Sequence, residues 1–171
     1  MEKRYTVYIG LGSNLGDRVA HLRDAIRHMA PAVTLQRVSQ LYVAAPLGYV
    51  RDDAFVNAVI EGTTTLKPIR LLEELKDIEA AMGRPRDVQH GPQLIDLDIL
   101  LYGGLYMETV ELTIPHPLLA KRAFVLKPLA ELAPNLMHPL LYYTMSELLN
   151  DADDVEQVKI YHPPRPGEPP V

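Results

Sequence analysis

The first hundred residues alternate between two hydrophobic periodicities in a fixed order, and this order constrains the fold more than any other feature. Stretches rich in β-branched and apolar residues predict four strands, at residues 5–11, 33–43, 55–65 and 94–102. Between them, apolar residues recur every three to four positions and predict two helices. The first helix begins after Asp17, a good N-cap, and the second begins at Pro68 and ends at Gly83. The order β-α-β-β-α-β predicts an α+β fold with a ferredoxin-like core.

Further elements follow this core. Gly103 and Gly104 predict a hairpin, Pro115-His116-Pro117 predicts a turn, and residues 118–132 predict short helical pieces. Five prolines among residues 163–171 predict a disordered tail. We therefore expect a single domain over residues 1–162, with added C-terminal helices and a hairpin.

Composition excludes several classes of function. The chain of 171 residues contains no cysteine, so disulfides and thiolate metal sites are excluded. A net charge of −5 argues against a nucleic-acid-binding surface. No apolar run approaches the roughly 20 residues that cross a bilayer, and the N-terminus lacks the apolar segment of a secretory signal. We expect a cytoplasmic monomer with neither nucleic acid nor membrane as a partner.

The most informative pair of residues is Asp96 and Asp98, at the start of the fourth predicted strand. Strand alternation places both carboxylates on one face and Leu97, Ile99 and Leu101 on the other. Two like charges about 6.5 Å apart repel by about 2.5 kcal/mol at an effective dielectric near 20. A Mg²⁺ ion, which favours carboxylates together with phosphate oxygens, would relieve that repulsion. The alternative is a solvated strand end that carries two acids.

The loop before this strand contains Arg84 and Arg86 and is bounded by Gly83 and Gly91. Guanidinium groups suit phosphate oxygens, and glycines at both ends suit a lid. The alternative is ordinary surface charge after a helix C-terminus. Glu79 lies at the margin of the second helix's apolar stripe, as a flanking residue or as a hydrogen-bond acceptor that faces a ligand.

Phe55 and Asn57 share one face of the third predicted strand. An aromatic ring beside an amide suits a flat, polar heterocycle, which stacks on the ring and bonds to the amide. The chain has two phenylalanines, Phe55 and Phe124, and the alternative is that both belong to the core. His116, in a rigid turn six residues before Arg122, could meet a phosphate or serve only as a turn.

Taken in order, these motifs resemble the hydroxymethyl-dihydropterin pyrophosphokinases. The resemblance runs from about residue 8 to about residue 139, and the ordered set is specific although no single piece is decisive. The matching motifs are Gly12-Ser13-Asn14-Leu15-Gly16, Pro46-Leu47-Gly48, Phe55-x-Asn57, Glu79-x-x-x-Gly83-Arg84-x-Arg86, Gly91-Pro92, Ile95-Asp96-Leu97-Asp98, Leu112-Thr113-Ile114-Pro115-His116-Pro117 and Arg122-x-Phe124.

The resemblance implies an ATP-dependent diphosphotransferase of folate biosynthesis. Such an enzyme transfers pyrophosphate from ATP to the hydroxymethyl group of 6-hydroxymethyl-7,8-dihydropterin and releases AMP. Asp96 and Asp98 would bind two Mg²⁺ ions that bridge the ATP phosphates. Arg84 and Arg86 would close over the phosphates from the lid and take part in catalysis.

The resemblance also implies which residues bind the two substrates. Phe55 and Phe124 would sandwich the pterin, while Asn57 and the backbone near Ala44 and Leu47 would bind its edge. The residues implied for the ATP site are Lys76, Glu79, Arg84, Arg86, Ile99, Thr113, His116 and Arg122.

The lid departs from the family pattern. It is one residue shorter than usual, Gln89-His90 replaces an Arg-Trp pair, and Gln93 replaces an arginine. These departures imply a slower turnover. They also leave open an enzyme that acts on a modified pterin, and a ferredoxin-like module that binds a ligand without chemistry stays a further alternative.

Overall fold

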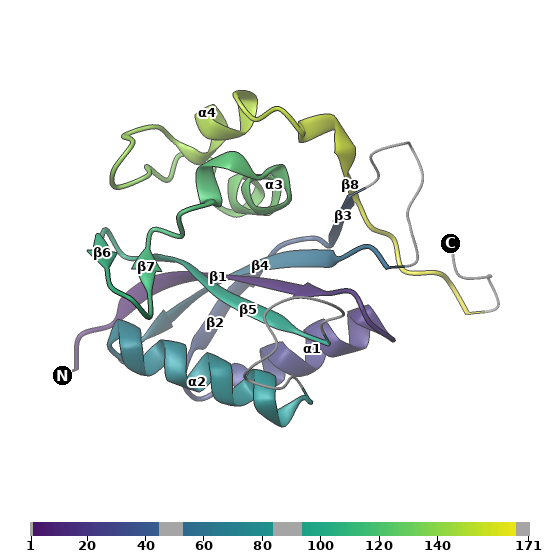
Figure 1. The fold of residues 1–171 in the computed structure, drawn as a ribbon, viewed down its shortest axis with the longest axis horizontal. Coiled ribbons are helices and arrows are strands. Elements are labelled where there is room, and N and C mark those ends of the chain that lie inside the picture. The colour runs from purple at the N-terminus through teal and green to yellow at the C-terminus, as the bar shows by residue number, and fades with distance from the viewer. Residues whose placement is uncertain (1, 45–52, 84–93, 167–171) are drawn as a thin grey trace.

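An antiparallel sheet of six strands organises the fold, and the computed structural model describes it through residues 2–44, 53–83 and 94–166. The strands follow the order β5-β1-β4-β3-β8, and β2 also pairs with β4 (Figure 1). Every pairing is antiparallel. The strands are β1 (Tyr5–Ser13), β2 (Thr34–Val38), β3 (Tyr42–Ala44), β4 (Val56–Thr64), β5 (Asp96–Tyr102) and β8 (Val158–Ile160).

Helices cover both faces of this sheet and give the molecule two hydrophobic cores. Helices α1 (Arg18–Met29) and α2 (Pro68–Ala81) lie on one face, and α3 (Ala123–Leu132) and α4 (Met145–Asn150) lie on the other (Figure 1). The core under α1 and α2 includes Val7, Ile9, Leu22, Leu75, Leu97 and Ile99. The core under α3 and α4 includes Tyr8, Val59, Leu100, Leu101, Leu126 and Leu129. The mixture of helix and antiparallel sheet agrees with the sequence-based expectation.

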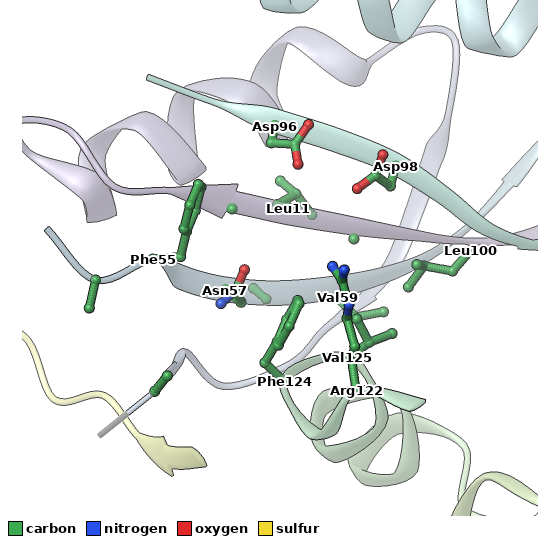
Figure 2. Close-up of a pocket in the computed structure, with 15 residues that line it drawn as sticks. Leu11, Phe55, Asn57, Val59, Asp96, Asp98, Leu100, Arg122, Phe124 and Val125 are labelled. Carbon is green, nitrogen blue, oxygen red and sulfur yellow. The ribbon is translucent and has the colours of Figure 1, made fainter. Parts of the chain in front are cut away.

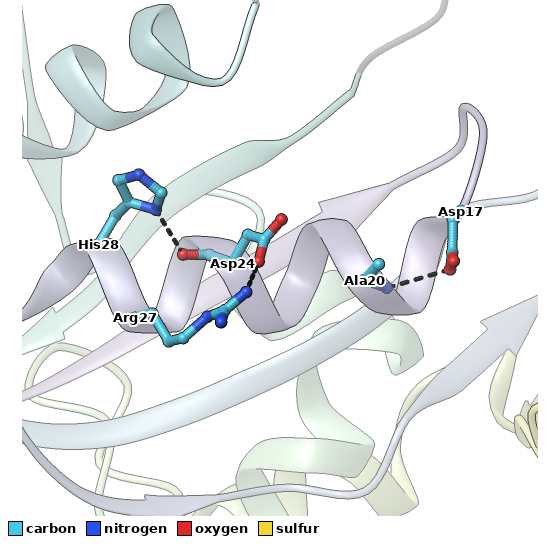
Figure 3. Close-up of polar contacts among 5 residues, drawn as sticks. All are labelled: Asp17, Ala20, Asp24, Arg27 and His28. Carbon is cyan, nitrogen blue, oxygen red and sulfur yellow. Dashed lines mark hydrogen bonds and ion pairs between the residues drawn. The ribbon is translucent and has the colours of Figure 1, made fainter.

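Local sequence signals determine where the first two helices begin and end. The Asp17 carboxylate accepts a hydrogen bond from the backbone N–H of Ala20 (3.1 Å), as expected for an N-cap (Figure 3). Near the other end, Arg27 pairs with Asp24, and His28 donates from Nδ1 to the Asp24 carbonyl (2.7 Å; Figure 3). Cations in the last turn also interact favourably with the helix dipole. Helix α2 starts at Pro68, and Gly83, with φ of +97°, follows its end, as predicted.

The stretch 33–43, predicted as one strand, forms two strands separated at Ser39. The buried Ser39 donates from its N–H to the Val59 carbonyl (2.9 Å) and accepts from the Val59 N–H through Oγ (2.9 Å). The next residue, Gln40, donates instead to the carboxylate of Glu131 on α3 (3.1 Å). The side-chain bonds of Ser39 and Glu131 therefore interrupt the regular ladder, and the chain resumes it only at β3.

The predicted face of Leu101 is wrong, because β5 contains a β-bulge. Ile9 pairs with Ile99 and Tyr8 pairs with Leu101, which leaves Leu100 as an additional residue on β5. Leu97 and Ile99 lie in the core under α1 and α2 as predicted, whereas Leu101 joins Leu100 in the core under α3 and α4. The alternation upstream of the bulge is unaffected, so Asp96 and Asp98 keep a common face.

The predicted hairpin at Gly103 and Gly104 forms at a different place. Gly103 has φ of +51° and turns the chain out of β5, but the next strand does not return along β5. Instead β6 (Met107–Glu108) pairs with β7 (Thr113–Ile114) in a separate two-stranded sheet. The helical pieces predicted at 118–132 are the 3₁₀ turn η1 (Leu119–Lys121) and α3.

The C-terminal part adds elements that the sequence analysis did not locate individually. A second 3₁₀ turn, η2 (Val155–Gln157), leads into β8, which pairs with β3 at the sheet edge. Residues 163–166 of the predicted tail carry neither helix nor strand, and residues 167–171 lie outside the described residues. Within the described ranges, every helix is too short or too polar to span a bilayer.

Packing around Gly62 on β4 predicts a measurable cost for a single methyl group. A Cβ atom at Gly62 would lie 2.6 Å from Cγ1 of Val33 and 2.8 Å from the Thr34 carbonyl oxygen. Because backbone cannot easily move away, Gly62→Ala should lower the free energy of unfolding by about 1–3 kcal/mol. Gly104→Ala is the matched control, since its Cβ would meet nothing within 4 Å. Urea denaturation of both variants checks this, and equal losses of stability would contradict the steric argument.

Candidate active site

A cavity of about 360 Å³ lies between the sheet and the N-terminal end of α3 (Figure 2). Strands β1, β4 and β5 supply one side, and α3 supplies the other. The described residues that line it are Gly10, Leu11, Gly12, Ala44, Ala54, Phe55, Asn57, Ala58, Val59, Asp96, Asp98, Leu100, Arg122, Phe124 and Val125.

Two glycines of β1 keep the floor of the cavity open. Gly12 pairs with Asn57 and Gly10 pairs with Val59 across the β1–β4 ladder. A Cβ atom at Gly12 would lie 2.8 Å from Oδ1 of Asn57 and 3.2 Å from Cδ1 of Phe55. The positions of Asn57 and Phe55 therefore depend on the missing side chain at Gly12.

An aromatic slot forms the apolar half of the cavity. Phe55 immediately precedes β4, Phe124 lies in the first turn of α3, and both side chains are half-buried. Figure 2 shows the two rings on either side of the Asn57 amide. A slot with an aromatic wall on each side and an amide at its base suits a flat heterocycle with polar edges.

Two carboxylates form the acidic half of the cavity. Asp96 and Asp98 are half-buried alternate residues of β5, and both project from the strand on the cavity side (Figure 2). Hard oxygen donors of this kind fit Mg²⁺. In the described ranges, no three His, Cys, Asp or Glu side chains cluster closely enough to enclose a metal ion. The pair therefore offers an ion two carboxylate ligands from one strand.

Arg122 and His116 bring polar donors to the same region. Arg122 lines the cavity, and its guanidinium lies 5.5 Å from the centre of the Phe124 ring. The His116 Nδ1 accepts from the backbone N–H of Leu118 (3.2 Å), which leaves Nε2 to carry the proton of the neutral ring. Burial lowers the pKa of His116 below 6.5, and the Arg122 charge lowers it further, against the opposing effect of Asp96. Near neutral pH, His116 is therefore an uncharged donor.

Besides His116, four further predicted nucleotide-binding residues lie outside the cavity lining. Glu79 is buried on α2, where its carboxylate accepts from the Leu97 N–H (3.3 Å), and Lys76 is exposed on the same helix. The Ile99 side chain lies in the core under α1 and α2. Thr113 is half-buried on β7, in the small sheet. All four lie on β5 or on elements that contact it.

The remaining predicted residues divide into two groups. Ala44 lines the cavity together with Phe55, Asn57 and Phe124. Leu47, Arg84 and Arg86 lie outside the described residues, as do His90 and Gln93 of the altered loop.

Several further lining residues were not predicted from the sequence, although strand alternation could have identified them. Val59 follows Asn57 by two positions, and Leu100 follows Asp98 by two, so each shares the face of a predicted site residue. Gly10 is related to Gly12 in the same way. Ala54 and Val125 adjoin the two phenylalanines and carried no periodic signal of their own.

Comparison with known proteins connects this geometry to one family. The family model described as "7,8-dihydro-6-hydroxymethylpterin-pyrophosphokinase (HPPK)" matches residues 8–134. The chain is 46% identical over 127 residues to 2-amino-4-hydroxy-6-hydroxymethyldihydropteridine pyrophosphokinase of Bacillus subtilis, which covers 73% of this chain and 76% of that protein. The Aquifex aeolicus protein of the same name is 38% identical over 142 residues, covering 83% of this chain and 89% of that protein.

Other relatives are much longer than this chain. The Dictyostelium discoideum folic acid synthesis protein FOL1 is 40% identical over 142 residues, and the chain spans only 22% of its length. A crystal structure of Plasmodium falciparum HPPK-DHPS A437G with pteroate superposes with a TM-score of 0.73 at 17% identity, covering 93% of this chain and 47% of that one. At this identity the structural match concerns the fold alone.

The electrostatics of His116 can be tested without reference to any ligand. Because the Arg122 charge disfavours the imidazolium form, Arg122→Met should raise the pKa of His116 toward 6.5. His138 is the internal control, since burial alone lowers its pKa and the substitution should leave it unchanged. NMR titration of both imidazoles checks the prediction. A His116 that titrates above 6.5 in the parent protein would contradict the environment described here.

Proposed function

The chain belongs to the 7,8-dihydro-6-hydroxymethylpterin-pyrophosphokinase family, and we propose that its cavity transfers pyrophosphate from ATP to the hydroxymethyl group of 6-hydroxymethyl-7,8-dihydropterin. The reaction releases AMP and serves folate biosynthesis. The observation that carries this proposal is one cavity that joins an aromatic slot to a pair of carboxylates. The longer relatives include bifunctional proteins, whose further activities are not part of the proposal.

The aromatic slot binds the pterin. Phe55 and Phe124 stack on its two faces, and Asn57 at the base of the slot offers both a donor and an acceptor to its polar edge. Ala44, at the end of β3, lines the slot beside them. Together with Leu47, which the sequence assigns to this group, these residues hold the hydroxymethyl group toward the acidic half of the cavity.

The acidic half binds the triphosphate. Asp96 and Asp98 would hold Mg²⁺, and the family resemblance implies two ions, for which the triphosphate would supply further oxygens. Bound Mg²⁺ neutralises the charge that develops on the phosphate oxygens. Arg122 adds a fixed positive charge on the opposite wall. Neutral His116 donates from Nε2 to a phosphate oxygen without the cost of burying another charge.

The outer edge of β5 binds the nucleotide base. The Leu97 N–H points to this edge, where it donates to Glu79, and the Leu100 carbonyl accepts there from the His116 N–H (2.9 Å). Alternate residues of a strand direct their backbone groups to the same side, so the backbone of Ile99 faces this edge as well. Ile99 therefore acts through its N–H and carbonyl, which agrees with a side chain in the core. Glu79, Lys76 and Thr113 border the same edge.

Catalysis then rests on positioning and on charge. The hydroxymethyl oxygen attacks the β-phosphorus, the bond between the α- and β-phosphates breaks, and AMP leaves. The slot fixes the attacking oxygen, while Asp96, Asp98, Arg122 and His116 fix the phosphates. The sequence assigns Arg84 and Arg86 to the lid, and we propose that they bind the phosphates together with these four residues.

We also propose a ferredoxin-like plan with a divided edge strand, because the sheet order β5-β1-β4 is followed by β2 and β3, with α1 and α2 on one face. A monomer as the working unit and a cytoplasmic location stay predictions from the sequence.

Removal of either carboxylate tests the proposed metal-binding role. Asp96→Asn and Asp98→Asn should each lower the turnover number by about 100-fold or more, because a metal clamp on phosphates contributes several kcal/mol to transition-state stabilisation. Glu73→Gln removes an exposed acid of α2 and should leave turnover unchanged. AMP release from MgATP and the pterin is the measurement, with melting temperatures recorded in parallel. Full activity of either Asp variant, or of the parent in excess chelator, would refute the role.

Truncation of the aromatic walls tests the pterin assignment. Phe55→Ala and Phe124→Ala should each weaken pterin binding by about 1–3 kcal/mol, the usual contribution of an aromatic ring stacked on a base. Nucleotide affinity should change little. Tyr106→Ala removes an exposed aromatic ring outside the cavity and is the control. Calorimetric titration with each ligand measures both affinities. Variants that no longer bind ATP but still bind the pterin would show that the two subsites are reversed.

A further inference from the structure

We propose that residues 154–161, here called the C-terminal strap, are a positioning element of the pterin slot. The inference rests on the function proposed above and assigns a role to a segment beyond residues 8–134, the part that matches the family model. The strap comprises the end of the turn before η2, η2 itself, β8 and Tyr161. It contacts two walls of the slot and reaches a third through Arg18.

The first wall is β3, which ends at Ala44. Strand β8 pairs with β3 through three residue pairs, and the last of them joins Val158 to Ala44. Ala44 also lines the cavity. The strap therefore supplies the outer ladder that holds this lining residue in the sheet.

The second wall is α3, which carries Phe124. Arg122, the residue before α3, provides no side-chain cap, and the strap residue Asp154 accepts from the Ala123 N–H instead (3.2 Å). A carboxylate at this end also favours the helix dipole. One turn later, the Lys127 ammonium donates to the Val158 carbonyl (2.5 Å).

Phe124 packs against a small hydrophobic cluster to which the strap contributes. The buried members of this cluster are Tyr42, Ala123 and the strap residue Val158, and the strap residue Val155 packs against it as well. The position of Phe124 therefore depends on the strap both through the helix that carries it and through this shared cluster.

The third wall is Phe55, which the strap reaches through Arg18. The Arg18 guanidinium lies 5.3 Å from the centre of the Tyr161 ring and donates to the Ala54 carbonyl (2.6 Å), next to Phe55. The Tyr161 N–H donates to the Leu41 carbonyl (2.7 Å), which fixes the ring beside β3. A cation in the first turn of α1 opposes the helix dipole. Arg18 is therefore poorly placed to stabilise its own helix and well placed to hold Ala54.

One segment thus links both aromatic walls of the slot. Asp96 and Asp98 lie on β5, at the opposite edge of the sheet from β8. Loosening the strap should therefore reduce pre-organisation of the pterin slot and leave the nucleotide half in place. If the segment were needed only for stability, loosening it would instead change the affinities for both substrates together, or for neither.

Point substitutions test this better than deletion of the strap, because Val158 is buried in the core. Asp154→Ala removes the cap of α3, whereas Asp154→Asn keeps an acceptor oxygen. Tyr161→Leu removes both the ring and the hydroxyl that accepts from Arg18 (3.5 Å), whereas Tyr161→Phe removes the long hydrogen bond alone and keeps the ring beside the guanidinium. Asp153→Ala, an exposed neighbour of Asp154, is the control.

Each variant is titrated with 6-hydroxymethylpterin in the presence of Mg²⁺ and α,β-methylene-ATP, which blocks the bond that the reaction breaks, and with the nucleotide alone. Asp154→Ala and Tyr161→Leu should raise the pterin Kd and KM by about 3- to 10-fold, as expected for loss of a single ordering contact. The nucleotide Kd should change by less than about 2-fold. Asp154→Asn, Tyr161→Phe and Asp153→Ala should stay near the parent, and melting temperatures identify variants that fail to fold.

Phe124→Ala in the same titration separates the two proposals. If it weakens pterin binding while Asp154→Ala and Tyr161→Leu, both folded, do not, the strap has no positioning role although the slot is correct. Equal losses of affinity for the nucleotide and for the pterin would likewise overturn the positioning role of the strap. If Phe124→Ala leaves pterin binding unchanged, the slot is wrongly assigned and the strap proposal fails with it.

Discussion

The antiparallel pairing of β1 with β4 is the interaction on which the rest of the structure depends. It runs without a break through nine residue pairs, from Tyr5 opposite Thr64 to Ser13 opposite Val56. An unbroken register determines which side chains reach each face of the sheet. Val7 and Ile9 therefore enter the core under α1 and α2, whereas Tyr8, Gly10 and Gly12 face α3. A shift of one residue would place bulky side chains where the cavity requires glycine.

The bulge in β5 divides that strand between two tasks. Before it, strict alternation presents Asp96 and Asp98 to the cavity and buries Leu97 and Ile99 beneath the helices on the other face. After it, Leu101 contributes to the second core. The additional residue allows one strand to support a charged site and a hydrophobic core on the same face without interrupting its pairing with β1. The carboxylates remain at the half-buried end, where solvent and a bound cation can compensate their charge.

The cavity is completed from the far end of the chain. Helix α3 brings Phe124 and Arg122 over the sheet, and its position is fixed by side chains from distant segments, among them Glu131 with Tyr42 (2.6 Å) and Asp154 with Ala123 (3.2 Å). Each of these bonds joins residues that are far apart in sequence. The apolar half of the site is consequently more dependent on tertiary contacts than the acidic half, whose two residues follow each other along one strand.

The sequence by itself determined the order of helices and strands in the β-α-β-β-α-β core apart from the division of its second strand, the Asp17 cap, the common face of Asp96 and Asp98, and the pairing of Phe55 with Asn57 in the cavity lining. These features depend on local spacing, because the periods of the strand and the helix determine which residues share one face of the element. Only the tertiary structure decided the break at Ser39, the bulge at Leu100, the placement of Leu101 in the second core and the attachment of residues 154–161. Each of these results from contacts between segments distant along the chain, whose geometry no local period encodes.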